Sequence, residues 1–100
     1  MRRASTPTHE FELPFDSSMV LRFLLTYKQG SRIILEKRES DMTVAGNIWS
    51  IKLTQEETNL FSDKTYAYAQ IRVLTPGGDS LHSDIFRVYV GEVLNDEVLV

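Results

Sequence analysis

Cysteine is missing from this 100-residue chain, so a disulfide framework, a thiolate metal site and a cysteine nucleophile are all excluded. Long apolar runs are missing as well. No stretch approaches the ~20 residues that cross a bilayer as a helix, and the N-terminus lacks the apolar segment of a signal peptide. We therefore expect a protein made in the cytoplasm, stabilised by apolar burial and without a membrane partner.

An excess of positive charge is also missing. The chain has 11 Lys and Arg residues against 14 Asp and Glu residues, for a net charge of −3. Its nearest approaches to a basic cluster are Arg2-Arg3 and Lys37-Arg38. Because proteins that bind nucleic acid usually carry a basic stripe or patch, the sequence predicts no nucleic-acid partner.

The length is that of a single domain, and the content of 42% hydrophobic and 25% charged residues is ordinary for a globular protein. Residues 1–7 are expected to form a flexible arm, residues 8–91 the domain and residues 92–100 a C-terminal tail. The tail carries five aliphatic residues: Val93, Leu94, Val98, Leu99 and Val100. An apolar tail on a small domain normally needs a surface that covers it.

Strand signals recur along the domain. Runs that alternate in polarity, or that are rich in β-branched and aromatic residues, occupy residues 8–13, 19–28, 32–38, 42–45, 48–53, 65–75 and 80–90. The last two runs form the clearest pair, because Pro76-Gly77-Gly78-Asp79 offers a fixed φ and positive-φ positions for a hairpin turn. Leu81 is out of phase with Phe86, which predicts a β-bulge near His82-Ser83-Asp84.

The period changes between the fifth and sixth runs. Thr54-Gln55-Glu56-Glu57 has the form of a capping box, and Leu60 and Phe61 supply the apolar side of one or two helical turns. Seven short strands with this helical turn between the fifth and the sixth predict an all-β fold. Specifically, we expect an immunoglobulin-like β-sandwich of about seven antiparallel strands.

Strand periodicity also predicts the core, because alternate residues of a strand point to the same side. The side chains expected around Trp49 are those of Leu21, Phe23, Ile71 and Phe86. On the strand 32–38, the inward phase falls on Ile33 and Leu35 and the outward phase on Ile34.

Reactive residue types are present without the geometry of a reaction centre. His82-Ser83-Asp84 has the residue types of a hydrolytic triad. Neighbours in a strand point to opposite faces, so the Ser83 hydroxyl would point away from its base. Glu56 and Glu57 could suggest acid–base work on a sugar, but the capping box explains both. The sequence predicts no catalytic residue and no enzyme.

Metal and nucleotide sites are not indicated either. His9 and His82 lie far apart in the chain, with no cysteine to complete a zinc site. Asp79 and Asp84 are better explained as turn formers than as calcium ligands, and Gly77-Gly78 lacks the context of a phosphate-binding motif. We expect no metal and no cofactor.

The outer face of the last hairpin carries the most informative residues. One phase of its two strands points away from the predicted core and is unusually aromatic and aliphatic: Tyr66, Tyr68, Leu74, Ile85 and Tyr89. Because monomers seldom expose large contiguous apolar areas, we expect these residues, with Val98 and Leu99 of the tail, to contact another protein. A register slip of one residue would instead place some of them in the core.

Three segments taken together resemble a known group of proteins: THEFELPFD, IKLTQEET and AQIRVLTPGGDSLHSDIFRVYVGEVLNDEVL. They resemble small proteins encoded by phages and prophages of Gram-positive bacteria, and are similar to the N-terminal domains of phage upper-baseplate proteins. The similarity covers about residues 8–99, rests on turn and strand patterns, and carries no catalytic residues. It implies an Ig-like structural module located in the virion after synthesis in the host bacterial cytoplasm. The C-terminal coiled coil or receptor domain of the baseplate proteins has no counterpart here, so the resemblance does not assign a position within the virion.

We therefore predict a non-enzymatic virion or tail/baseplate-associated structural module that acts through protein–protein contacts. Its expected partner is itself, as a homo-oligomer, or another virion structural protein. The alternative is a carbohydrate-binding or host-surface recognition module with Tyr66, Tyr68 or Tyr89 as stacking platforms. A glycan site needs exposed aromatic rings beside fixed polar donors, whereas an assembly face is broadly apolar and meets a symmetry mate.

Overall fold

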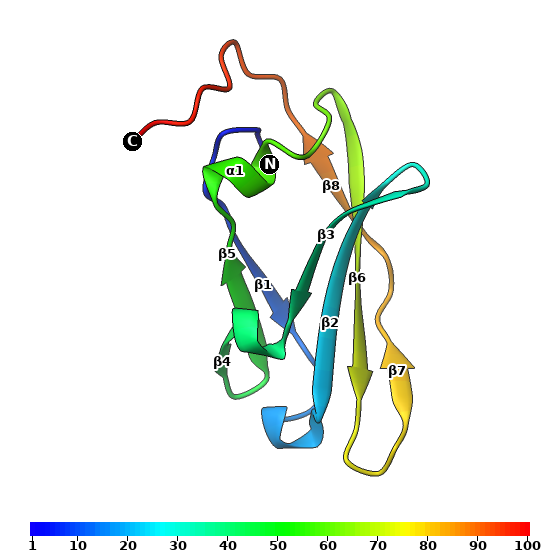
Figure 1. Cartoon of the computed structure of the whole chain (residues 1–100). Helices are drawn as coiled ribbons and strands as arrows, with labels where there is room; N and C mark the ends of the chain where they lie inside the picture. The colour runs from blue at the N-terminus through cyan, green and yellow to red at the C-terminus, as the bar shows by residue number, and fades with distance from the viewer.

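Two antiparallel sheets form the domain (Figure 1). The computed structural model describes all residues, 1–100. The small sheet has the order β1-β5-β4, and the larger sheet has the order β3-β2-β6 with β7 and β8 along the free side of β6. The strands are β1 (Thr8–Glu12), β2 (Arg22–Gln29), β3 (Arg32–Arg38), β4 (Thr43–Ala45), β5 (Ile48–Lys52), β6 (Thr65–Leu74), β7 (Ser80–His82) and β8 (Phe86–Val90). The other elements are the 3-10 turns η1 (Ser17–Met19) and η2 (Glu39–Asp41) and the helix α1 (Gln55–Thr58). The predicted all-β sandwich is confirmed.

β7 and β8 behave as one strand interrupted by a bulge. Arg72 of β6 pairs with His82, and Ala69 pairs with Phe86, so three steps on β6 (72 to 69) face four on its partner (82 to 86). Ser83 fills the irregularity: its hydroxyl accepts from the Ile71 N–H at 2.9 Å, and its own N–H donates to the Ile71 carbonyl at 2.8 Å. The bulge predicted at this place is therefore present, and the sandwich has seven strand positions.

The strand order corresponds to that of an immunoglobulin domain whose first strand is reduced. Variable-type domains place strands C′, C, F and G in one sheet and B, E and D in the other. Here β3, β2, β6 and β7/β8 take the first set of positions and β1, β5 and β4 the second. The N-terminal residues before β1 form no strand and make one parallel bridge, between Arg2 and Gly91. Residues 1–7 thus lie against the domain, and their flexibility stays a prediction.

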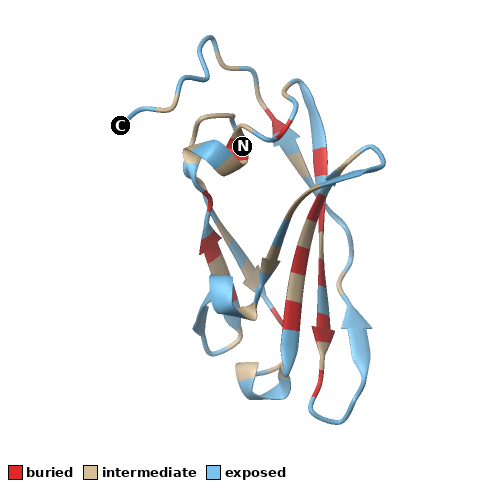
Figure 2. Cartoon of the chain, viewed as in Figure 1, coloured by how far each residue is buried: buried red, intermediate tan, exposed pale blue.

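The core lies between the sheets, and Figure 2 shows buried positions alternating along β2 and β6. The inward phases predicted for β5 and β6 are confirmed, since Trp49, Ile51 and Leu53 are buried, as are Ala67, Ala69, Ile71 and Val73. Trp49 stacks on Phe23 across the sandwich, with ring centroids 4.4 Å apart and planes 3° from parallel. Such a pair adds about 0.5–1.5 kcal/mol beyond its buried area.

Two neighbours predicted for Trp49 are not core residues. Leu21 is 49% exposed and lies between η1 and the first residue of β2, at the end of the larger sheet. Phe86 is 41% exposed because it lies on an edge strand, where its ring touches Phe11 at a centroid distance of 5.7 Å. Both residues have the correct phase, but each lies at a border of the sandwich.

The predicted phase of β3 is wrong at two positions. Tyr27 pairs with Leu35 and Lys28 pairs with Ile33, so Ile34 is an extra residue. Ile33 therefore shares the outer face with Lys28, whereas Ile34 packs against the core. A β-bulge reverses the alternation beyond it, and strict alternation along the sequence cannot reveal it.

The predicted capping box starts α1. The Thr54 Oγ1 accepts from the Glu57 N–H at 3.1 Å, and the Glu57 carboxylate accepts from the Thr54 N–H at 3.0 Å. Lys37 of β3 forms an ion pair with Glu57, which ties the helix to the larger sheet. Of the two apolar residues expected to support the turn, Phe61 is buried and Leu60 is exposed.

Trp49→Ala should lower the free energy of unfolding by about 3–5 kcal/mol, because it leaves a cavity beside Phe23. That loss is a large part of the ~5–10 kcal/mol expected for the whole domain. Urea denaturation followed by circular dichroism measures it. Ile48→Ala is the matched control, since Ile48 lies next to Trp49 on the opposite, exposed face of β5. An unchanged denaturation midpoint for Trp49→Ala would contradict the assigned core.

Thr54→Ala should cost roughly 1 kcal/mol, since the Glu57 N–H loses its acceptor at the start of α1. Thr54→Ser keeps a hydroxyl oxygen at the same position and should retain most of the stability. Thermal unfolding of the two variants and the wild type compares them directly. Equal losses for the Ala and Ser variants would show that the hydrogen bond is not what Thr54 contributes.

Candidate functional site

The outer face of the larger sheet brings most of the predicted contact residues together. Directly paired residues of an antiparallel sheet point to the same side. Tyr66 pairs with Tyr89 and Tyr68 pairs with Arg87 between β6 and β8, and Lys28 of β2 lies opposite Tyr68. We define the tyrosine patch as Tyr66, Tyr68, Ile85, Arg87 and Tyr89.

The aromatic rings of the tyrosine patch are half-exposed and contact one another. Tyr66, Tyr68 and Tyr89 are 41%, 41% and 49% exposed. The rings of Tyr66 and Tyr89 meet edge to face, with centroids 5.3 Å apart and planes at 72°. The Arg87 guanidinium lies over the Tyr66 ring, 4.7 Å from its centroid, a cation–π geometry that stiffens an exposed side chain.

Of the remaining predicted contact residues, only Ile85 belongs to the tyrosine patch. Ile85 is exposed where the bulge rejoins β8, beside Tyr68 and above a small open hollow. Leu74 ends β6 at the opposite end of the same face and is half-buried. Val98 and Leu99 belong to the tail, which runs past α1, and they do not join the tyrosine patch (Figure 1).

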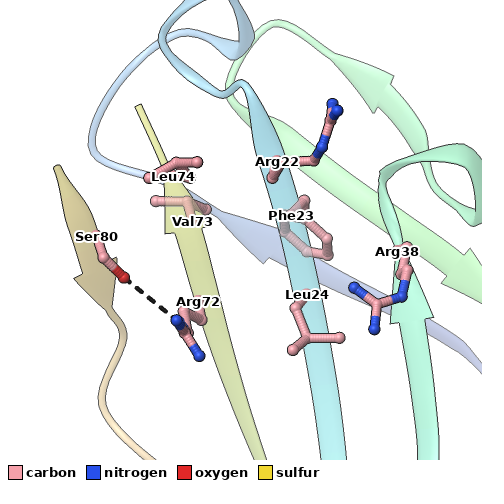
Figure 3. Close-up of a pocket in the computed structure, with 8 residues that line it drawn as sticks. All are labelled: Arg22, Phe23, Leu24, Arg38, Arg72, Val73, Leu74 and Ser80. Atoms are coloured by element: carbon pink, nitrogen blue, oxygen red, sulfur yellow. Dashed lines mark hydrogen bonds between the residues drawn. The ribbon is translucent and has the colours of Figure 1, made fainter. Parts of the chain in front are cut away.

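Leu74 belongs to a second surface that sequence reasoning missed. We define the arginine groove as Arg22, Leu24, Arg38, Arg72, Leu74 and Ser80. These residues, with Phe23 and Val73, line an open depression of about 360 Å³. Leu24 pairs with Arg38 on one side and with Arg72 on the other. Since neighbouring strands are ~4.8 Å apart, the two arginines flank Leu24 at a Cα separation of about 10 Å. Figure 3 shows their side chains on either side of Leu24.

The arginines of the groove are weakly compensated. Arg22 and Arg38 lie 3.7 Å from Glu39 and 3.6 Å from Glu36 in exposed ion pairs, which contribute little. Arg72 has no carboxylate within 4.0 Å, and its Nε donates to the Ser80 Oγ at 3.3 Å (Figure 3). The Phe23 N–H bound to the Glu39 carboxylate, helped by nearby arginines, lowers the pKa of Glu39.

This face is positive in a protein that is negative overall. Its strands β2, β3, β6 and β8 contribute five cations to the outer side: Arg22, Lys28, Arg38, Arg72 and Arg87. Glu36 is the carboxylate paired into the same face, and Glu39 lies at its border. The sequence does not reveal this cluster of cations, because each strand supplies only one or two of them.

The residues once considered for catalysis and metal binding do not converge on a site. The Ser83 hydroxyl is engaged in the bulge and donates to the Asp84 carbonyl at 2.8 Å. His82 lies on the outer face opposite Arg72. No three His, Asp or Glu side chains are close enough to share a metal ion, and the chain has no helix of the length and apolarity needed to cross a membrane.

His9 and Tyr27 form a polar contact at the inner side of β1 and β2. The His9 Nδ1 and the Tyr27 Oη are 2.5 Å apart. Burial raises the pKa of Tyr27, so its hydroxyl keeps its proton and can donate a hydrogen bond to an unprotonated Nδ1 of His9. Burial, together with the nearby Met1 amine, lowers the pKa of His9. Burial and the positive charge of that amine therefore favour the neutral form of His9.

Comparisons with models of known protein families, with curated proteins and with solved structures give no match to this chain. Function therefore has to be inferred from the residues and their geometry.

The free energy of unfolding should decrease as the pH is lowered through the range where His9 takes up a proton. The pKa of His9 is below its ordinary 6.5 in the folded chain, so the unfolded chain binds more protons and stability decreases as the pH falls below that value. Urea unfolding between about pH 7.5 and 5 measures this slope. His9→Gln should flatten it, and His82→Gln, which changes an exposed histidine, should leave it intact. An unchanged slope in His9→Gln would assign the effect to other groups.

Proposed function

We propose that this protein is a non-enzymatic structural module that acts through protein–protein contacts, with the outer face of the larger sheet as its contact surface. The observation that carries the proposal is the tyrosine patch, where three half-exposed tyrosines are neighbours on β6 and β8. Tyrosine is enriched at interfaces because its ring buries a large apolar area while its hydroxyl keeps a hydrogen bond.

The position of the patch supports this use. β6 is paired on both sides at Tyr68, with Lys28 of β2 and with Arg87 of β8, and Tyr66 follows two residues beyond, where β8 alone pairs with it. Side chains on a rigid element lose little freedom when a partner binds, which preserves binding energy. The edge-to-face contact of Tyr66 with Tyr89 and the cation–π contact with Arg87 order the patch further.

The setting we propose is a phage virion, in or near the tail or baseplate, with a second copy or another virion structural protein as the partner. The sequence resemblance supports this setting. The structure adds a β-sandwich that exposes the tyrosine patch on one face. Carbohydrate recognition is less well supported by the geometry. Arg87 already covers one face of the Tyr66 ring, and Tyr89 meets that ring at 72°, so the two rings do not offer a common stacking platform.

The double variant Tyr68→Ser/Tyr89→Ser should shift the protein toward the monomer in light scattering with little loss of fold. Truncation of one interface hot spot costs about 2 kcal/mol, which is roughly 30-fold in affinity. Deletion of residues 93–100 should also shift the protein toward the monomer. The matched control is Ile48→Ser/Leu60→Ser, which removes two exposed apolar side chains elsewhere on the surface.

Association that survives in the tyrosine double variant would show that the patch is not the contact surface. A wild-type protein that stays monomeric at high concentration would exclude a second copy as the partner.

A further inference from the structure

The arginine groove has the chemistry to receive a segment that is both acidic and apolar. Leu24 and Leu74 are half-buried and form its floor, and Arg22, Arg38 and Arg72 form its rim. Guanidinium groups bind carboxylates with paired hydrogen bonds. Because Arg38 and Arg72 stand on opposite sides of Leu24, a carboxylate placed over this leucine can reach both.

The tail has this composition. Residues 92–100 contain Glu92, Asp96 and Glu97 and no cationic residue. Glu97 has no cation within 4.0 Å, whereas Asp96 pairs with Arg3 at 2.9 Å. The tail also exposes apolar side chains, since Leu99 is 74% exposed and Val100 is fully exposed. Charge and apolarity in the tail thus complement those of the groove.

Gln55 of α1 and Asn59, its C-cap, hold the backbone of the tail and leave the side chains of Leu94, Leu99 and Val100 exposed. The Asn59 Nδ2 donates to the Asp96 carbonyl at 2.9 Å, and the Gln55 side-chain amide donates to and accepts from the Leu99 backbone, both at 2.9 Å. In Figure 1 the tail leaves the sandwich beside α1. These contacts fix the course of the tail without burying it.

The tail held in this way lies far from the groove of its own chain. Val90 pairs with Thr65 at the first end of β6, and the groove lies around Arg72 and Leu74 at the other end. Nine residue steps of strand span about 30 Å. A second copy can bring its groove to the tail without breaking the contacts with α1.

We propose that the arginine groove is the receptor for the tail of a second copy. Its Glu97 carboxylate lies between Arg38 and Arg72, over Leu24, and its exposed aliphatic side chains cover the floor of the groove. This inference rests on the proposed function, protein contact through the outer face, and names both the partner and the contact that selects it.

Charge reversal in the full-length chain tests the proposal by sedimentation velocity. Glu97→Lys and Arg72→Glu should each weaken self-association by at least about tenfold, because each places like charges in contact. Added salt should weaken the wild-type association, since the groove is exposed. Arg32→Glu is the matched control: it reverses an exposed arginine in the β2–β3 hairpin, outside the groove, and should leave association unchanged.

Reciprocal rescue separates a direct contact from a folding defect. The double variant Glu97→Lys/Arg72→Glu should associate again, and so should an equimolar mixture of the two single variants, because each residue 97 can then meet a residue 72 of opposite charge. Glu97→Lys/Arg32→Glu should not be rescued. Failure of both rescues, or a wild-type protein that is monomeric at its solubility limit, would overturn the proposal.

The two proposals fail in different ways. If Tyr68→Ser/Tyr89→Ser weakens association while Arg72→Glu and Glu97→Lys do not, the groove is not the receptor but the outer face remains the contact surface. If none of these variants changes association, both proposals are wrong.

Discussion

The alternation of β6 is the constraint on which the rest of the structure depends. Its inner phase, Ala67 to Val73, is buried in the sandwich, and its outer phase carries two tyrosines of the tyrosine patch and the central arginine of the arginine groove. Since β6 pairs with β2 on one side and with β7/β8 on the other, a shift of one residue would expose the core phase and bury Arg72. Burial of the apolar phase and exposure of the charged phase therefore favour the same pairing register for β6.

Small residues on β6 make room for large ones beside it. Tyr27 of β2 pairs with Ala69 and is fully buried, and its ring meets Phe61 edge to face at a centroid distance of 5.7 Å. Phe61 follows α1, so the helical connection supplies one wall of this cluster. The same connection holds the tail through Gln55 of α1 and through Asn59, the C-cap of the helix. One short element thus closes the core and directs the segment proposed to reach another copy.

The separation of charge gives the domain a direction. Cations from four strands meet on the outer face of the larger sheet, whereas the charged residues of the tail are all acidic. Fields of opposite sign on one molecule favour head-to-tail contact between copies and disfavour contact between like faces. A heterologous contact of this kind builds rings or filaments according to the rotation that relates the copies.

Local patterns determined much of this protein. The strand periods, the Pro76–Asp79 hairpin, the bulge at Ser83, the capping box at Thr54 and the outer phase of the tyrosines are all predicted by sequence patterns a few residues long. Tertiary structure decided what depends on distant partners. The extra residue Ile34, the exposure of Leu21 and Phe86 at the borders, and the docking of residues 1–7 could not be predicted. The cluster of cations on the outer face of the larger sheet could not be predicted either, because it forms only when strands that are distant in sequence pair with one another.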